Sequence, residues 1–225
     1  MTVRRVVRSL SELCITAGAL LVLFVVYLLH WTGVRAEQAG SARIDTLRKE
    51  WASTPTTGTP APARTQTPYA PGRGIAVMYV PRFGRDWEWP VLEGTGPGVL
   101  EQGLGHYPRT ARLGDTGNFA VAGHRRTHGD PFKDFPRLRP GDAVVLTDGT
   151  AWYTYRIDRG PHRTVPTDTA VVDPVPRKSG FTGPGRYLTL TTCDPEWGSS
   201  HRLIAWAHLD ATRPVTDGRP QALDS

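Results

Sequence analysis

Cysteine is scarce in this chain of 225 residues, because the sequence holds only Cys14 and Cys193. Two cysteines so far apart cannot make the dense framework of bridges that stabilises small secreted scaffolds. The sequence therefore excludes a disulfide-stapled fold. Any thiol that faces an oxidising compartment then needs a reason to be there.

Long basic runs are also missing, although the formal net charge is +6. The positive charge comes mainly from scattered arginine, and no RNA-binding signature is present. We therefore expect no nucleic-acid partner. A basic exterior suits an anionic membrane or a cell wall equally well.

Clear helical periodicity is lacking in the second half of the chain, where glycine and proline are frequent. The 24 Gly and 20 Pro residues make up about a fifth of the chain, against a usual combined share of roughly an eighth. Short β-rich runs bounded by turn residues occur at 75–80, 118–123, 142–147, 152–157, 186–192 and 202–209. This pattern predicts an all-β barrel or sandwich over residues 75–209, followed by a polar tail over 210–225.

One long apolar run is present, at residues 13–34, and it carries no charge. Its 22 residues span about 33 Å as a helix, enough for a hydrocarbon core of about 30 Å. Three arginines in residues 1–12 precede it, which keeps that terminus cytoplasmic. The alternative is a cleaved signal peptide, but its apolar core is usually shorter and the small-x-small site at 34–36 is poor. We expect a single-pass anchor in the cell membrane, with the rest of the chain extracellular.

The segment 35–74 separates this anchor from the β-rich region. Residues 35–51 could form a short juxtamembrane helix with a thin apolar stripe. Residues 53–74 contain five prolines and six threonines, a composition typical of a semi-extended spacer.

Cys193 is the cysteine expected outside the membrane. It ends the run 187–192 and precedes a turn, and Arg202 opens the next run. If the two runs pair as an antiparallel hairpin, their backbones lie about 4.8 Å apart, and the thiol faces the guanidinium. Arginine is a suitable donor for the oxyanion that forms when a thiolate attacks a carbonyl. The alternative is a cysteine buried as packing.

A thiol nucleophile also needs a proton partner, which is most often histidine. His124 follows the apolar run 118–123, so it too lies at a strand end, and it is our choice; His128 is the reserve. The two have the HxxxH spacing of a zinc helix, but Arg125 stands where HExxH has its glutamate. We therefore expect no metal.

These residues resemble a known family. The sequence LTLTTC at 188–193 followed by Arg202, with AGH at 122–124 far upstream, is similar to the motifs of sortases. The stretch 105–146 resembles class E sortases, the actinobacterial housekeeping type. The resemblance covers residues 75–209.

The resemblance implies an eight-stranded sortase β-barrel with short helices and 3-10 turns, behind a single N-terminal transmembrane helix. It implies a cysteine transpeptidase that cuts secreted proteins after threonine in a C-terminal LAXTG or LPXTG sorting signal. The acyl group then passes to an amine of the peptidoglycan precursor. By motif, Cys193 is the nucleophile, His124 the proton donor and acceptor, and Arg202 the oxyanion or substrate-binding group. Tyr107 resembles the tyrosine linked to the LAXTG preference. No cofactor is implied.

Three other classes of protein would show a different pattern or give Cys193 another role. An L,D-transpeptidase would show SHGC-like residues where this chain has TTCDP. A papain-like peptidase carries its cysteine at a helix start and ahead of its histidine. A non-enzymatic wall- or lipid-binding module would use Cys193 for packing. No lid segment with an aromatic plug is evident, which favours a housekeeping enzyme over a pilin polymerase.

Overall fold

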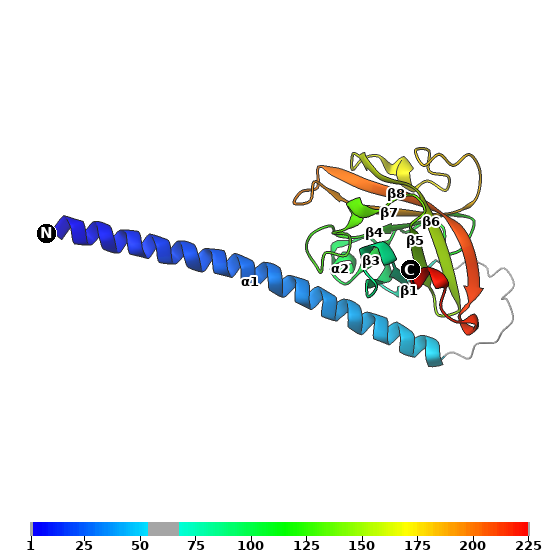
Figure 1. Ribbon diagram of the computed structural model, residues 1–225, viewed down its shortest axis with the longest axis horizontal. Helices are drawn as coiled ribbons and strands as arrows, with labels where there is room; N and C mark the ends of the chain where they lie inside the picture. Colours follow the sequence, from blue (N-terminus) through cyan, green and yellow to red (C-terminus); the bar gives the residue numbers. More distant parts are fainter. Residues whose placement is uncertain (1, 54–67, 225) are drawn as a thin grey trace.

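A closed β-barrel follows a long helix in the computed structural model of the chain, which describes residues 2–53 and 68–224 (Figure 1). The eight strands are β1 (Gly74–Tyr79), β2 (Glu88–Glu93), β3 (Leu104–His106), β4 (Gly117–Ala122), β5 (Ala143–Thr147), β6 (Ala151–Thr164), β7 (Arg186–Asp194) and β8 (His201–Pro214). The helices are α1 (Thr2–Ser53), α2 (Pro97–Leu100) and the short 3-10 turns η1 (Pro81–Phe83), η2 (Phe135–Arg137), η3 (Thr169–Val172), η4 (Val215–Asp217) and η5 (Gln221–Leu223).

The strands follow the order β1-β2-β3-β4-β7-β8-β6-β5 around the barrel. Neighbouring strands are antiparallel except for two parallel pairs, β2 with β3 and β4 with β7. The parallel β4–β7 pair and the antiparallel β7–β8 pair bring three strand ends together at one rim. The ends of these strands, at Ala122, Asp194 and His201, form the reactive rim of the barrel.

All six β-rich runs predicted from the sequence are strands, and the predicted all-β, eight-stranded barrel is confirmed. The runs at β2 and β3 gave no signal of their own. Pro90 lies inside β2, and proline normally argues against a strand interior. β3 has only three residues, with Gly105 at its centre.

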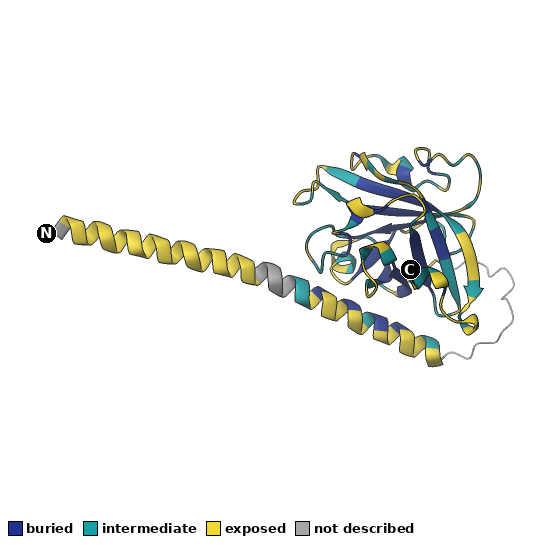
Figure 2. Ribbon diagram, viewed as in Figure 1, coloured by how far each residue is buried: buried dark blue, intermediate teal, exposed yellow. Residues whose placement is uncertain are grey.

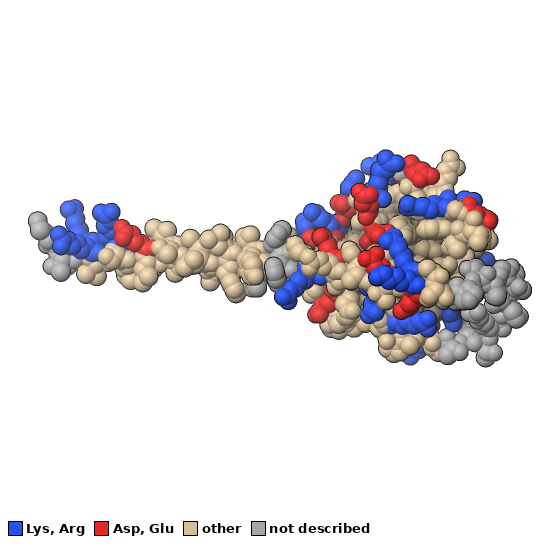
Figure 3. All heavy atoms as spheres, turned by 90° about the horizontal axis from the view of Figure 1, so that it is seen from below, with Lys and Arg blue, Asp and Glu red and all other residues tan. Residues whose placement is uncertain are grey.

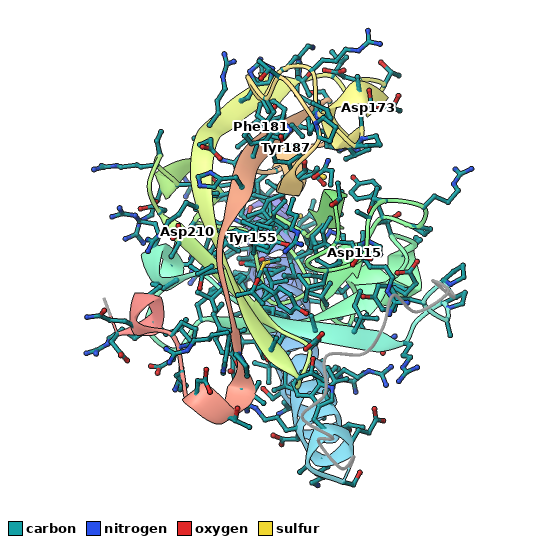
Figure 4. All side chains as sticks on the ribbon, turned by 90° about the vertical axis from the view of Figure 1, so that its right-hand side faces the viewer. Asp115, Tyr155, Asp173, Phe181, Tyr187 and Asp210 are labelled. Carbon is teal, nitrogen blue, oxygen red and sulfur yellow. The ribbon has the colours of Figure 1, made fainter. Side chains whose placement is uncertain are left out.

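The alternation of side chains along β4, β7 and β8 separates an inner from an outer face. Phe119, Leu190 and Ala205 belong to the barrel interior. Trp206 belongs to a second cluster on the outer face, which the β6–β7 connection covers through Val171. Phe181 of this connection stacks on Tyr187 at the start of β7, with ring centroids 4.0 Å apart, and Figure 4 labels the two side chains next to each other.

The helix α1 is continuous through the expected anchor and the juxtamembrane segment. Within the described residues, Val3–Tyr27 is long and apolar enough to cross a membrane, with a mean hydropathy of 2.2. This part is exposed along its length, whereas the later part of the helix is buried along one side (Figure 2). Ile44 and Leu47 pack with Val77 and Val145 on the barrel wall. The predicted Pro/Thr-rich spacer lies largely outside the described residues, at 54–67.

The segment expected as a polar tail continues the barrel. β8 runs on to Pro214, which pairs with Ala151 at the start of β6. Beyond it, Leu223 packs against the cluster of Ile44 and Leu47. The strand extends past the apolar run because β6 is equally long and supplies a pairing partner.

Candidate active site

Cys193 and Arg202 face each other across the β7–β8 ladder, as their spacing predicted. Cys193 is the last residue but one of β7, and its side chain is half-buried at the rim. Arg202 is held in place by its own loop, because its Nη1 donates to the carbonyl oxygens of Ser199 at 2.8 Å and His201 at 2.9 Å. The thiol and the guanidinium therefore start from fixed neighbouring backbones.

The register of the parallel β4–β7 pair places His124 beside Cys193. Its last ladder pair is Ala122 with Thr191. The alignment continues beyond it, because the Thr192 hydroxyl donates to the Gly123 carbonyl at 2.8 Å. The next position aligns His124 with Cys193, on strands that lie about 4.8 Å apart. His124, Cys193 and Arg202 thus occupy the ends of three adjacent strands.

Tyr107 lies next to this site, on the outer face of the barrel. Its hydroxyl and that of Thr191 are 2.9 Å apart and share a hydrogen bond. Thr191 precedes Cys193 by two residues, so the two side chains emerge on the same face of β7. Tyr107 is therefore fixed along the strand that leads to the thiol.

His124 lies in a partly desolvated setting with a second histidine on its ring. Burial lowers the pKa of His124, the nearby His128 lowers it further, and the charge of Glu101 opposes both. The rings of His124 and His128 stack with centroids 4.9 Å apart. His124 therefore gives up its proton at a lower pH than an exposed histidine does. His128, the second candidate for the proton partner, instead contacts the His124 ring and lowers its pKa.

Comparison with known proteins decides the family. The family model of the sortase domain matches residues 78–210, the span that contains all three strand ends. The chain belongs to the sortase family. This sortase is 40% identical to "Sortase SrtE1" of Streptomyces coelicolor over 97% of its own length, but it spans only 61% of that relative. It is 33% identical to "Sortase SrtE2" of the same organism, covering 95% of this chain and 85% of the relative.

Solved structures support class E. The structure of sortase E from Streptomyces avermitilis is 69% identical to this sortase, with a TM-score of 0.66 over 69% of this chain and 99% of the other. The structure of sortase E1 from Streptomyces coelicolor, whose description names a tripeptide in its active site, is 41% identical, with a TM-score of 0.64 over 68% of this chain and 98% of the other.

Two ion pairs that the sequence reasoning missed join the two loops of the site. Arg125 follows His124 and Asp194 follows Cys193, and the Arg125 Nη1 lies 2.5 Å from the Asp194 carboxylate. Arg163 from β6 contacts the other carboxylate oxygen at 2.7 Å. Burial raises the pKa of Asp194, but the hydrogen bonds and charges of Arg163 and Arg125 outweigh it, so this pKa lies below its ordinary value.

The second pair joins Arg126 to Glu196, one residue further along the first loop and two residues further along the second. Together the pairs fix the segment after His124 to the segment after Cys193. A signal for the first pair was present in the sequence, since residues of opposite charge directly follow the two reactive candidates. This signal predicts an ion pair only if β4 and β7 are known to be parallel neighbours in this register.

The arrangement has the components of nucleophilic catalysis by a thiol. A half-buried cysteine, a histidine of lowered pKa and an arginine share one face, and each is held by backbone pairing or loop hydrogen bonds. Such a set can attack a carbonyl carbon, exchange a proton with the departing or entering amine and donate to an oxyanion. Within the described ranges, no group of three or more His, Cys, Asp or Glu side chains is placed to hold a metal ion.

Proposed function

We propose that this sortase is a membrane-anchored cysteine transpeptidase that cleaves a LAXTG- or LPXTG-type sorting signal after threonine and transfers the protein to an amine of the peptidoglycan precursor. The observation that carries the proposal is the placement of His124, Cys193 and Arg202 on three adjacent strand ends, within the span that matches the sortase domain.

The first half of the reaction forms a thioester. The Cys193 thiolate attacks the threonine carbonyl carbon, and the oxyanion that develops accepts N–H donation from Arg202. The His124 imidazolium then gives its proton to the leaving glycine amine as the C–N bond breaks. The acyl group remains on Sγ, and His124 is left neutral.

The second half reverses the proton transfer. The acceptor amine attacks the thioester carbon while neutral His124 takes a proton from it. The C–S bond breaks, and the thiolate and imidazolium are restored together. The proposed roles need His124 charged in one half and neutral in the other, which suits a group with a pKa near the working pH.

Tyr107 is proposed to lie along the bound signal, because its hydroxyl is bonded to Thr191 two residues before the nucleophile. From that position it would contact the residue that distinguishes LAXTG from LPXTG. The Tyr107→Phe variant removes the hydroxyl alone. An unchanged ratio of kcat/KM between the two peptides would leave Tyr107 as a packing residue.

The experiment uses the full chain in detergent with LAXTG and LPXTG peptides and a glycine-type amine, and products are read by mass. We expect cleavage after threonine and transfer to the amine, both lost in Cys193→Ala and strongly reduced in Arg202→Ala. Cys14→Ala is the matched control, because it removes the other cysteine, from the apolar part of α1, and should keep full activity. No product, together with a thiol that resists an alkylating reagent, would instead favour the non-enzymatic binding module.

A further inference from the structure

The later part of α1 lies along the barrel in a defined direction. Near Gly40 the helix meets the Trp89 ring, since a Cβ built on Gly40 would lie 3.3 Å from it. The side chain of Glu37 lies beside Gly129, in the loop that begins at His124. At its other end, the helix places Trp51 against Gly149 in the β5–β6 turn.

These contacts identify which end of the barrel is nearer the apolar part of the helix. β8 runs from Arg202 at the reactive rim to Pro214, which pairs with Ala151, two residues after Gly149. Trp51 therefore contacts the end of the barrel opposite Cys193. The reactive rim faces the N-terminal, apolar part of α1, and in Figure 1 the β7–β8 loop lies on the side toward which the helix runs to its N-terminus.

Measured along the axis of α1, the reactive rim also lies close to the end of the apolar part of the helix. Glu37 follows Tyr27 by ten residues, which is about 15 Å of helix. If the apolar span extends to residue 34, as the sequence predicts, the distance falls to about 5 Å. The polar layer on each side of a bilayer is about 5–8 Å thick. The loops next to Glu37 thus lie at or just above the headgroups of any membrane that α1 crosses.

Exposed apolar side chains gather at the same rim. Among the described residues outside α1, the large hydrophobic side chains that are exposed are Trp197 at 71% and Val165 at 48%. Trp197 lies in the β7–β8 loop, and Val165 directly follows Thr164, which pairs with Arg202. The Arg126 guanidinium packs 4.9 Å from the centroid of the Trp197 ring. Tryptophan is enriched where a membrane meets water, because its ring is apolar and its N–H is polar.

The charges around these two residues are balanced. Arg126 is paired with Glu196, Arg163 with Asp194 and Lys178 with Asp168. On the face of the barrel that carries α1, Figure 3 also shows acidic and basic side chains interspersed. A surface of this kind contacts lipid through its apolar side chains, without a strong preference for anionic headgroups.

We propose that Trp197 and Val165 form a membrane-contact surface that inserts into the headgroup layer of the bilayer in which α1 is anchored. The contact holds the mouth of the site, with Cys193, toward the membrane. A protein still held in that membrane by its own C-terminal helix then presents its sorting signal at the height of the thiol. This inference rests on the proposed membrane anchorage and, for its effect on rate, on the proposed transpeptidation.

The first arm of the test measures contact with lipid and does not depend on activity. The full chain is placed in phosphatidylcholine vesicles whose acyl chains are brominated near the headgroup, and tryptophan emission is compared with unbrominated vesicles. We expect bromine to quench part of the tryptophan emission of the wild type and to quench less emission in Trp197→Phe. Trp152→Phe, at the opposite end of the barrel, is the matched control, and the amount of emission that bromine quenches should be the same as in the wild type. Equal quenched emission in the wild type and Trp197→Phe would overturn the proposal.

The second arm compares two substrates of the same sequence, one free and one carried on a membrane-spanning peptide in the vesicle. We expect the double variant Trp197→Ser, Val165→Ser to cleave the membrane-held substrate about threefold more slowly, because the contact raises the local concentration of signal and thiol. The rate on the free peptide should not change. An equal loss on both substrates would instead make the loop part of the peptide site and overturn the proposal. If the wild type cleaves neither substrate, the proposed function fails, while the quenching arm still decides whether the rim contacts lipid.

Discussion

Two arginines at opposite ends of β8 have nearly the same local structure and different surroundings. Arg202 donates to the carbonyl oxygens of Ser199 and His201 at the reactive rim. Arg213 donates in the same way to the Asp217 carbonyl at 2.7 Å, at the other end of the strand. Both therefore serve to hold a loop. Only Arg202 lies opposite Cys193, whereas Arg213 lies opposite Trp152.

The neighbouring strand therefore determines what an arginine on this barrel can do. At the reactive rim, the parallel β4–β7 pair adds His124 to the β7–β8 pair. At the opposite end, the short β5–β6 turn is covered by Trp51 of α1 and presents no histidine or cysteine from the described residues next to Arg213. An arginine hydrogen-bonds to a loop at both ends of β8, and a catalytic role is proposed only for the one at the reactive rim.

The largest expected effect comes from exchanging these two arginines for alanine. Arg202→Ala should lower kcat by about 10²–10³-fold, the usual result of removing one donor to an oxyanion. Arg213→Ala should leave kcat and KM unchanged. It removes hydrogen bonds to a loop, as Arg202→Ala does, but Arg213 lies opposite Trp152 and not opposite a thiol. The measurement is peptide cleavage by the full chain in detergent. An equal loss of kcat in the two variants would show that Arg202 is required only for its hydrogen bonds to the loop.

A smaller effect is expected from the carboxylate that joins the two loops of the site. Asp194→Asn weakens the pairs with Arg125 and Arg163, so His124 and Cys193 lose their fixed separation. We expect kcat to fall about tenfold to a hundredfold, since small misplacements of reacting groups cost this much. The readouts are kcat, KM and the pH dependence of Cys193 alkylation.

Asp142→Asn is the matched control for that variant. Asp142 is also paired with an arginine, Arg82, at 2.5 Å. Burial raises the pKa of Asp142, but the hydrogen bonds and charges around it outweigh burial and lower this pKa. Asp142 directly precedes β5, at the end of the β4–β5 connection that is remote in sequence from His124, so loss of this pair should reduce the free energy of unfolding and leave kcat unchanged. A fall in kcat as large as that of Asp194→Asn would rule out a positioning role specific to Asp194.

The smallest effects concern the proton affinity of His124, and two variants should move it in opposite directions. His128 lowers the pKa of His124 and Glu101 raises it. His128→Asn should therefore raise this pKa, so that the imidazolium persists to higher pH and the midpoint of the His124 titration moves to higher pH. Glu101→Gln should lower the pKa and move that midpoint to lower pH. Titration of the His124 ring proton by NMR measures both, and shifts of the same sign would contradict the account.

The sequence predicted the parts of the fold that follow from local composition. The run 142–147 contains Val144, Val145 and Thr147, the run 202–209 is mostly apolar, and both are bounded by turn residues, so β5 and β8 were evident. β2 was not, because Pro90 lies within a strand whose pairing with β1 depends on the closed barrel. The extension of β8 to Pro214 was equally hidden, since its polar residues are strand-forming only beside the long β6.

The part of the site that lies on the β7–β8 hairpin could be predicted from the sequence. Cys193 and Arg202 are separated by a short loop, so antiparallel pairing alone brings them together. His124 could be chosen because it follows an apolar run and so lies at a strand end, but its place beside Cys193 depends on a parallel pairing between strands far apart in sequence. The pairs of Arg125 with Asp194 and of Arg126 with Glu196 depend on that same register, which no spacing in the sequence encodes. The packing of α1 on the barrel was likewise unforeseen, because its apolar stripe is thin.

The most direct test of the account is the mass of the enzyme during turnover. The full chain is mixed with the sorting-signal peptide without an acceptor amine, quenched in acid and weighed intact, with digestion to locate any adduct. We predict an added mass equal to the peptide fragment that ends in threonine less one water, attached to Cys193 as a thioester. The adduct should persist in Cys14→Ala and be absent in Cys193→Ala. Cleavage that continues in Cys193→Ala, or an adduct on another residue, would contradict it.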